Sequence, residues 1–258
     1  MACGSWGLAS LVPSHPRFHF SRVCHVHFHS KDFMSTEPFF NQEERDAVYR
    51  VIRARRDIRH FIPDRTIPAR VLERILRAAH QAPSVGLMQP WRIIHVHDRA
   101  LRDKLKAEVE KERLATADAL GGRQDAFLKL KVEGIAECAE LLVMVMAPDD
   151  GTVLGRRTLP REMAISSCAC AIENMWLAAR AENLGLGWVS FFDPRQVAGL
   201  LGCPDTAEPL AILCLGPVES FPPAPLLALQ GWREEKALEA LLYHDRYGEE
   251  PAPPEGGV

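Results

Sequence analysis

The chain alternates between segments with helical hydrophobic periodicity and short, continuous apolar runs. Apolar residues spaced three and four positions apart predict helices over residues 41–56 and 67–83, the second beginning at Pro68 and ending before Pro83. Residues 99–134 are strongly charged and predict a largely exposed helical region that a Gly-Gly pair interrupts. From residue 162 onward, a long helix that is apolar almost all round is predicted, with Gly185 as its C-terminal cap. A helix of that composition should be central to the fold.

Four apolar runs have the length of strands, at residues 91–98, 139–148, 187–192 and 209–218. A short helix capped by Asp193 is predicted between the last two. We find no internal repeat and no linker rich in Gly or Ser that would divide the chain. The pattern therefore predicts one α+β domain over residues 39–250, with a loosely patterned tail after Phe221.

The first 38 residues differ from the remainder and are predicted to be an N-terminal extension. No acidic residue precedes Asp32 and no helical periodicity is present, which is compatible with a transit peptide. The alternative that we favour is translation from Met34, with a tail or a start-site artefact upstream. His25, His27 and His29 alternate as metal ligands on one strand face could, but a solvated tail is the simpler interpretation, and no metal is expected.

Composition narrows the functional class. The formal net charge of −3 argues against a nucleic-acid-binding domain, and no apolar run reaches the roughly 18 residues of a membrane span. The seven cysteines include no CxxC pair, and most fall in apolar segments, which favours a reducing, cytoplasmic compartment. The sequence contains neither a GxGxxG nor a GxxxxGK[ST] motif, so it lacks the common sequence motifs of dinucleotide-binding and P-loop proteins.

Three segments carry side chains suited to binding or catalysis. "RRDIR", residues 55–59, offers guanidinium forks for an anion around one carboxylate, Asp57, although basic residues at a helix end are often only solvated. The loop "APSVGLMQPW", residues 82–91, offers the hydroxyl of Ser84 and the amide of Gln89, and Gly86 would let a flat ligand approach. In "GLGWVSFFD", residues 185–193, Ser190 stands among apolar neighbours and is expected to be a buried hydroxyl that needs a partner.

Taken in this order, the segments resemble the nitroreductase-like flavoprotein family. "RRDIR", "HQAPSVGLMQPW", "LKVEGI", "VLGR", "NMWLAARAENLGLGWVS" and "LCLG" carry the resemblance, which covers residues 43 to about 245. Within the family, they are most similar to the branch that makes 5,6-dimethylbenzimidazole, which has an aspartate where ordinary members have a serine. The resemblance implies a mainly antiparallel central sheet flanked by helices, and a homodimer with flavin sites at the interface and exchanged C-terminal arms.

For this branch, the resemblance implies that reduced FMN is the substrate. FMNH2 would react with O2 and be fragmented to 5,6-dimethylbenzimidazole, the lower ligand of cobalamin, with Asp57 as acid and base and Ser190 orienting the flavin intermediate. A separate NAD(P)H-dependent flavin reductase would supply FMNH2, and no nucleic acid, membrane or metal is implied. The implied FMN-binding residues are Arg55, Arg56, Asp57, Ile58, Arg59, Pro83, Ser84, Gln89, Lys131 and Ser190.

Two alternatives and one departure remain open. An NAD(P)H-dependent nitroreductase or flavin reductase that keeps its FMN would have the same fold, as would a non-catalytic or deiodinase-like flavoprotein. The branch usually has a second arginine after its GWR motif, where this chain has Glu235 followed by Lys236. A carboxylate there would repel a flavin phosphate unless the lysine compensates. Trp232 and Tyr243 suit a tail that docks on a partner.

Overall fold

The computed structural model describes residues 39–248, so the expectations for residues 1–38, including the three alternating histidines, lie outside the described residues. The chain divides into two units, residues 1–42 and 43–258, and the sheet with its covering helices belongs to the second. The helices and strands are α1 (Gln42–Ala54), α2 (Ala69–His80), η1 (Val85–Leu87), β1 (Trp91–Val96), α3 (Arg99–Ala119), η2 (Gly121–Arg123), α4 (Gln124–Leu128), β2 (Glu140–Met146), α5 (Pro160–Ala181), β3 (Gly185–Val189), α6 (Pro194–Leu201), β4 (Glu208–Gly216), α7 (Leu226–Leu229) and η3 (Leu238–Leu241).

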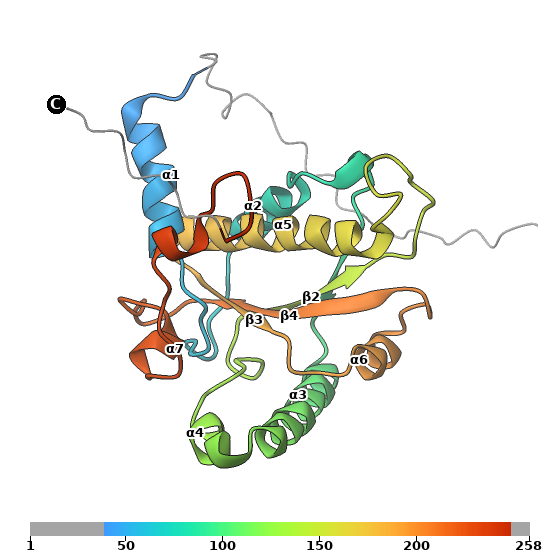
Figure 1. Ribbon diagram of the computed structural model, residues 1–258. Coiled ribbons are helices and arrows are strands. Elements are labelled where there is room, and N and C mark those ends of the chain that lie inside the picture. The colour runs from blue at the N-terminus through green and yellow to red at the C-terminus, as the bar shows by residue number, and fades with distance from the viewer. Residues whose placement is uncertain (1–38, 249–258) are drawn as a thin grey trace, which may run out of the picture. The chain divides into compact units, whose positions relative to one another are not determined.

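The four strands form one antiparallel sheet in the order β1-β2-β4-β3. β2 and β4, the two central strands, are apolar along nearly their whole length because both of their faces are covered. The sheet lies between α2 and α5 on one face and α3, α4 and α6 on the other (Figure 1). The predicted fold class, an α+β domain with a mainly antiparallel sheet flanked by helices, is therefore confirmed.

Alternation along the central strands divides the core into two clusters. Leu142 and Met144 point to the α2–α5 side, whereas Leu141 and Val143 point to the side of α3 and α6. Because successive strand residues face opposite sides of a sheet, one apolar run supplies both clusters. Each cluster contains many fully buried side chains, so the sheet is a rigid platform for its two edges.

The long helix α5 is central, as its composition predicts. Eight of its side chains are buried, and it packs against α2 and across the sheet. Its predicted end is wrong, because the helix ends at Ala181 and Gly185 is the first residue of β3. Consequently β3 covers Gly185–Val189 and begins two residues earlier than the predicted strand. Pro68 likewise caps α2 instead of occupying its first turn.

Within residues 39–248, no helix is both long enough and apolar enough to cross a bilayer. Among the same residues, no cluster of three or more His, Cys, Asp or Glu side chains is arranged to hold a metal ion.

Candidate active site at the outer edge of the sheet

The segment that follows α1 runs along β3 and places Asp57 at the outer edge of the sheet. Ile58 donates its backbone N–H to the carbonyl of Leu186 at 3.1 Å, and Asp57 forms an isolated parallel bridge with the same residue. Ile58 and Phe61 are buried in the core and anchor the segment. Since alternate side chains of an extended segment point to opposite sides, burial of Ile58 turns Asp57 and Arg59 away from the core.

The carboxylate of Asp57 is held through one of its two oxygens. Its Oδ1 accepts a hydrogen bond from Arg59 Nη1 at 2.5 Å and another from the backbone N–H of Trp188 at 3.1 Å. The protein atoms that crowd the carboxyl raise the pKa of Asp57 above its ordinary value, while Arg59, the Trp188 N–H and Arg55 act in the opposite direction. The side chain nevertheless remains 44% exposed, because it lies on the wall of an open pocket.

The two preceding arginines are fixed differently. Arg56 donates to the backbone carbonyls of Arg53, Arg55 and Pro223, yet its buried Nε has no hydrogen-bond partner among the described residues. Arg55 stacks 4.8 Å from the ring of Trp176 and lies 3.6 Å from Glu173. The guanidinium of Arg55 is thus held by side chains, and that of Arg56 by backbone carbonyls with one acceptor lacking.

Asp57 opens into a cavity of about 800 Å³, the volume of a pocket for a cofactor-sized molecule. Part of its lining is charged, from Arg55, Arg56, Asp57 and Arg59, and part is aromatic or aliphatic. The latter residues are Leu120, Phe127, Leu130, Val132, Phe191, Leu226, Leu227 and Trp232. A pocket that has both charged and apolar walls suits a ligand that combines an anionic group with a flat ring.

Part of the apolar wall comes from the C-terminal segment, residues 223–235, which we call the strap. Arg56 holds its beginning through the carbonyl of Pro223 at 2.7 Å. Near its end, the guanidinium of Arg123 lies 3.7 Å from the Trp232 ring and donates to the Trp232 carbonyl at 3.1 Å. The Trp232 ring also lies 6.1 Å from the ring of Phe127 in its own chain, and its docking on a partner stays a prediction. Tyr243 contacts only the ring of Tyr247 among the described aromatic pairs.

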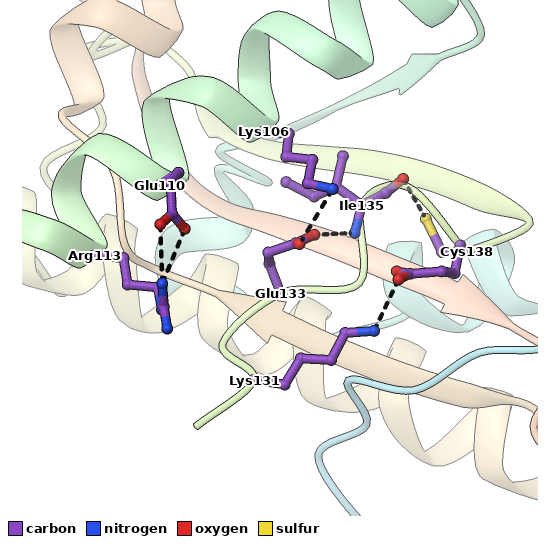
Figure 2. A network of polar contacts seen from close by, with 8 residues as sticks. Lys106, Glu110, Arg113, Lys131, Glu133, Ile135 and Cys138 are labelled. Carbon is purple, nitrogen blue, oxygen red and sulfur yellow. Dashed lines mark hydrogen bonds and ion pairs between the residues drawn. The ribbon is translucent and has the colours of Figure 1, made fainter. Parts of the chain in front are cut away.

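Lys131 and Glu235 also line the pocket. Lys131 lies in the connection between α4 and β2, where Glu133 accepts a 2.5 Å hydrogen bond from the backbone N–H of Ile135 (Figure 2). The ammonium of Lys131 lies 2.9 Å from Glu137, so its charge is already partly balanced within the protein. Glu235 places the unexpected carboxylate at the pocket itself, and Lys236 lies beside it in a neighbouring shallow depression.

The loop of residues 82–90 does not line this pocket. It precedes β1, at the edge of the sheet opposite to β3. Ser84 accepts a hydrogen bond from the Gln89 backbone N–H at 3.1 Å, which shapes the loop. Gly86 has a φ of +59°, and a Cβ there would lie 2.7 Å from Thr152, so within this chain its close neighbour is the 152–154 segment and not a ligand. Pro83, Ser84 and Gln89 are therefore separated from Asp57 within one chain.

Ser190 follows β3 directly and is exposed, so the expectation of a buried hydroxyl among apolar neighbours is wrong. Strand alternation explains the difference, because Val189 takes the buried position and Ser190 the outer one. Ser190 does not itself line the pocket, although its neighbour Phe191 does. The Trp188 N–H and the aromatic wall were missed from the sequence, since a backbone donor and an apolar side chain have no distinctive sequence signal.

The fold and the pocket define an α+β protein with an open cavity at one edge of an antiparallel sheet. The chain belongs to the nitroreductase family, whose sequence model matches residues 52–217. A relative from Rhodobacter capsulatus, named 5,6-dimethylbenzimidazole synthase, is 43% identical over 204 residues, which cover 78% of this chain and 97% of the relative. A protein of the same name from Rhodospirillum rubrum is 39% identical and covers 79% and 97%. The fold is also similar to that in the crystal structure of oxidised iodotyrosine deiodinase bound to FMN and 3-iodo-L-tyrosine, with a TM-score of 0.61 and 21% sequence identity. The match covers 78% of this chain and all of the other chain. At this identity the likeness supports the fold alone.

Proposed function

We propose that the protein uses O2 to fragment reduced FMN and release 5,6-dimethylbenzimidazole, the compound that the names of its 43% and 39% identical relatives give as the product. The observation that carries the proposal is the position of Asp57. A carboxylate that lies among arginines on the wall of a roughly 800 Å³ pocket is suited to move protons on a bound ring. In this proposal the flavin is consumed as a substrate instead of being kept as a cofactor.

The pocket fits a flavin mononucleotide in two respects. The buried Nε of Arg56 lacks an acceptor among the described residues, and a phosphate oxygen would supply one. Arg55 lines the same pocket with a side chain that is 34% exposed, and it is proposed to share in this role. The apolar wall around Phe127 and Phe191 offers a face on which a flat ring can stack. Glu235 opposes the fit electrostatically, which predicts a modest affinity for the phosphate group.

The proposed reaction needs electrons, oxygen and several proton transfers. In the proposal, the reduced flavin would supply the electrons that reduce O2, dissolved O2 is the oxidant, and the protein residues move the protons and position the flavin. Asp57 takes a proton from the ring system and returns it as the ring and the ribityl chain separate, while the Trp188 N–H keeps the carboxylate in place. Ser190, exposed beside the pocket, is proposed to orient the reacting flavin, and Lys131 adds positive charge at the wall.

Pro83, Ser84 and Gln89 reach the same flavin only if a second copy of the chain supplies them. They precede β1, whereas Asp57 lies beside β3, and two central strands separate these edges. We therefore propose a homodimer in which each site combines the Asp57 edge of one copy with the 82–90 loop of the other. Light scattering should give the mass of a dimer, and a monomer that binds FMN with full affinity would contradict the shared site.

One alternative has specific support, because the family model that matches is that of nitroreductases. In that case the protein would keep FMN and pass electrons from NAD(P)H to a nitroaromatic compound. The alternative predicts a yellow purified protein and rapid NADPH oxidation when a nitroaromatic is added. Our proposal predicts neither, and it requires a separate flavin reductase as the source of FMNH2.

The decisive experiment loads the protein anaerobically with photoreduced FMN, admits air and separates the products by chromatography. Wild-type protein should release 5,6-dimethylbenzimidazole, and Asp57→Asn should release at least about a hundredfold less, since loss of a general acid and base costs roughly 10²–10⁴ in rate. Asp103→Asn, which makes the same change on the exposed side of α3, is the matched control and should behave as wild type. Recovery of intact oxidised FMN from wild type would refute the proposal.

A further inference from the structure

The two oxygens of Asp57 have different surroundings. Both of its hydrogen bonds, from Arg59 and from the Trp188 N–H, end on Oδ1. Oδ2 receives no hydrogen bond from any residue between 39 and 248, and the side chain faces a pocket. The carboxylate is therefore anchored through one oxygen and leaves the other for a ligand.

Arg59 is itself fixed by the surrounding backbone. Its Nη1 donates to Asp57 Oδ1 and to the Ile58 carbonyl at 3.2 Å, and its Nη2 donates to the Trp188 carbonyl at 2.6 Å. Only 11% of the side chain is exposed. Both terminal nitrogens are thus engaged inside the protein, unlike those of an arginine kept ready for a phosphate.

The space for this guanidinium depends on Gly187. A Cβ atom at residue 187 would lie 2.6 Å from Arg59 Nη1 and would also clash with the Ile58 carbonyl. Any side chain on β3 at this position would therefore displace Arg59 from the Trp188 carbonyl. Strand β3 thus provides the Trp188 N–H as a donor to Asp57 and the Trp188 carbonyl as an acceptor for Arg59. Gly187, which has no side chain, leaves the space that the Arg59 guanidinium occupies.

The charge of Arg59 also acts on the proton of Asp57. Crowding by protein atoms raises the pKa of Asp57, and the largest opposing influence is the charge of Arg59, ahead of the Trp188 N–H and Arg55. Removing that charge while the carboxyl stays crowded should leave more of Asp57 protonated at neutral pH. A protonated Asp57 cannot accept a proton from the substrate.

We propose that Arg59 is a positioning residue: seated in the gap at Gly187, it holds Oδ1 of Asp57 so that Oδ2 is the oxygen that takes and returns the proton. The inference rests on the proposed function of the site. It gives Arg59 a role distinct from that of Arg55 and Arg56, since Arg59 acts on the carboxylate and they act on the flavin. During the transfer, Oδ2 gains a proton from the ring, Asp57 becomes neutral, and the same proton is later returned.

The first test titrates the Asp57 carboxyl without any flavin. Infrared difference spectra of wild type against Asp57→Asn isolate its carboxyl band over a pH series. The same difference is then measured in an Arg59→Gln background. Loss of an adjacent opposite charge should raise the titration midpoint by about 1 pH unit or more, while Arg59→Lys, which keeps the charge, should give a smaller shift. Arg74→Gln removes an equal charge on α2, where Arg74 pairs with Glu182, and should give none.

The second test compares turnover of photoreduced FMN with binding of oxidised FMN. In Arg59→Gln, product formation should fall at least tenfold, its acidic limb should move to higher pH with the carboxyl titration, and FMN affinity should change by less than threefold. An unshifted carboxyl titration would overturn the inference, and so would a loss that is mainly one of affinity. The infrared titration does not depend on the reaction. A wild-type protein that forms no 5,6-dimethylbenzimidazole would therefore refute the proposed function, while the infrared titration would still decide whether Arg59 controls the proton affinity of Asp57.

Discussion

The contacts between Arg123 and Trp232 predict how fast a flavin leaves the pocket. The strap forms part of the apolar wall, and near its end it is held by the stacking of Arg123 on the Trp232 ring and by one hydrogen bond to the Trp232 carbonyl. An exposed cation–π contact contributes about 0.5–1 kcal/mol, and the hydrogen bond contributes about 0.5–1.5 kcal/mol. Together they stabilise the closed strap by roughly 1–2.5 kcal/mol, which corresponds to a factor of about 5–70 in the open population.

Arg123→Ala should therefore speed the release of oxidised FMN by about tenfold. If the strap must open before the ligand leaves, the release rate is proportional to the open population, whereas the affinity changes less while the closed state still dominates. The release rate is measured by stopped-flow dilution, through the recovery of flavin fluorescence.

The matched control removes an arginine of similar exposure from α2. Arg77 donates two hydrogen bonds to Glu73 and lies away from the pocket, so Arg77→Ala should release FMN at the wild-type rate. A release rate for Arg123→Ala within twofold of wild type would refute the reasoning. It would mean that the strap does not close this pocket in solution, as expected if the C-terminal arm instead lies on a partner.

Three further predictions concern the core, the pocket charge and pH. Leu213→Ala removes a fully buried side chain on β4 and should lower the free energy of unfolding by about 2–5 kcal/mol in urea titrations. A loss below about 1 kcal/mol would mean that the surrounding side chains move in to fill the cavity. Glu235→Arg should tighten binding of FMN and leave that of riboflavin unchanged, as judged by fluorescence titration, because only FMN carries the phosphate. Burial raises the pKa of Asp57 above 3.8, so the native state takes up a proton at higher pH than the unfolded chain does. The free energy of unfolding of wild type, relative to that of Asp57→Asn, should therefore fall as pH rises from 3.8 through the native pKa. A difference between the two proteins that does not change with pH would count against the burial effect.

Much of the fold could be predicted because the strands and the helix that build the core have strong patterns. β2 and β4 are continuous apolar runs, and α5 is apolar on nearly every side, so each could be assigned without knowledge of the others. The boundary between α5 and β3 was misplaced because a glycine after a helix is ambiguous. Gly185 could cap the helix, but the chain turns at residues 182–184 and enters β3 at that glycine.

The candidate site could be predicted only in part. Asp57 and its neighbouring arginines lie in one short segment, and they line one pocket. The burial of Ser190 was predicted wrongly, because the apolar run hides which face each residue of β3 takes. The strap was also missed, since residues 223–235 have no periodic pattern and are held by single contacts such as that of Arg56 with Pro223.

The carboxylate among the arginines is explained by the balance of two opposing effects. Crowding by protein atoms raises the pKa of Asp57, and the charge of Arg59 lowers it. A group that must both accept and return a proton works best when neither form is strongly favoured. The edge of β3 holds both side chains with fixed backbone groups, namely the Trp188 N–H for Asp57 and the Trp188 carbonyl for Arg59. Because the same peptide groups belong to a strand that is paired with β4, the sheet fixes the positions of the donor to Asp57 and the acceptor of Arg59.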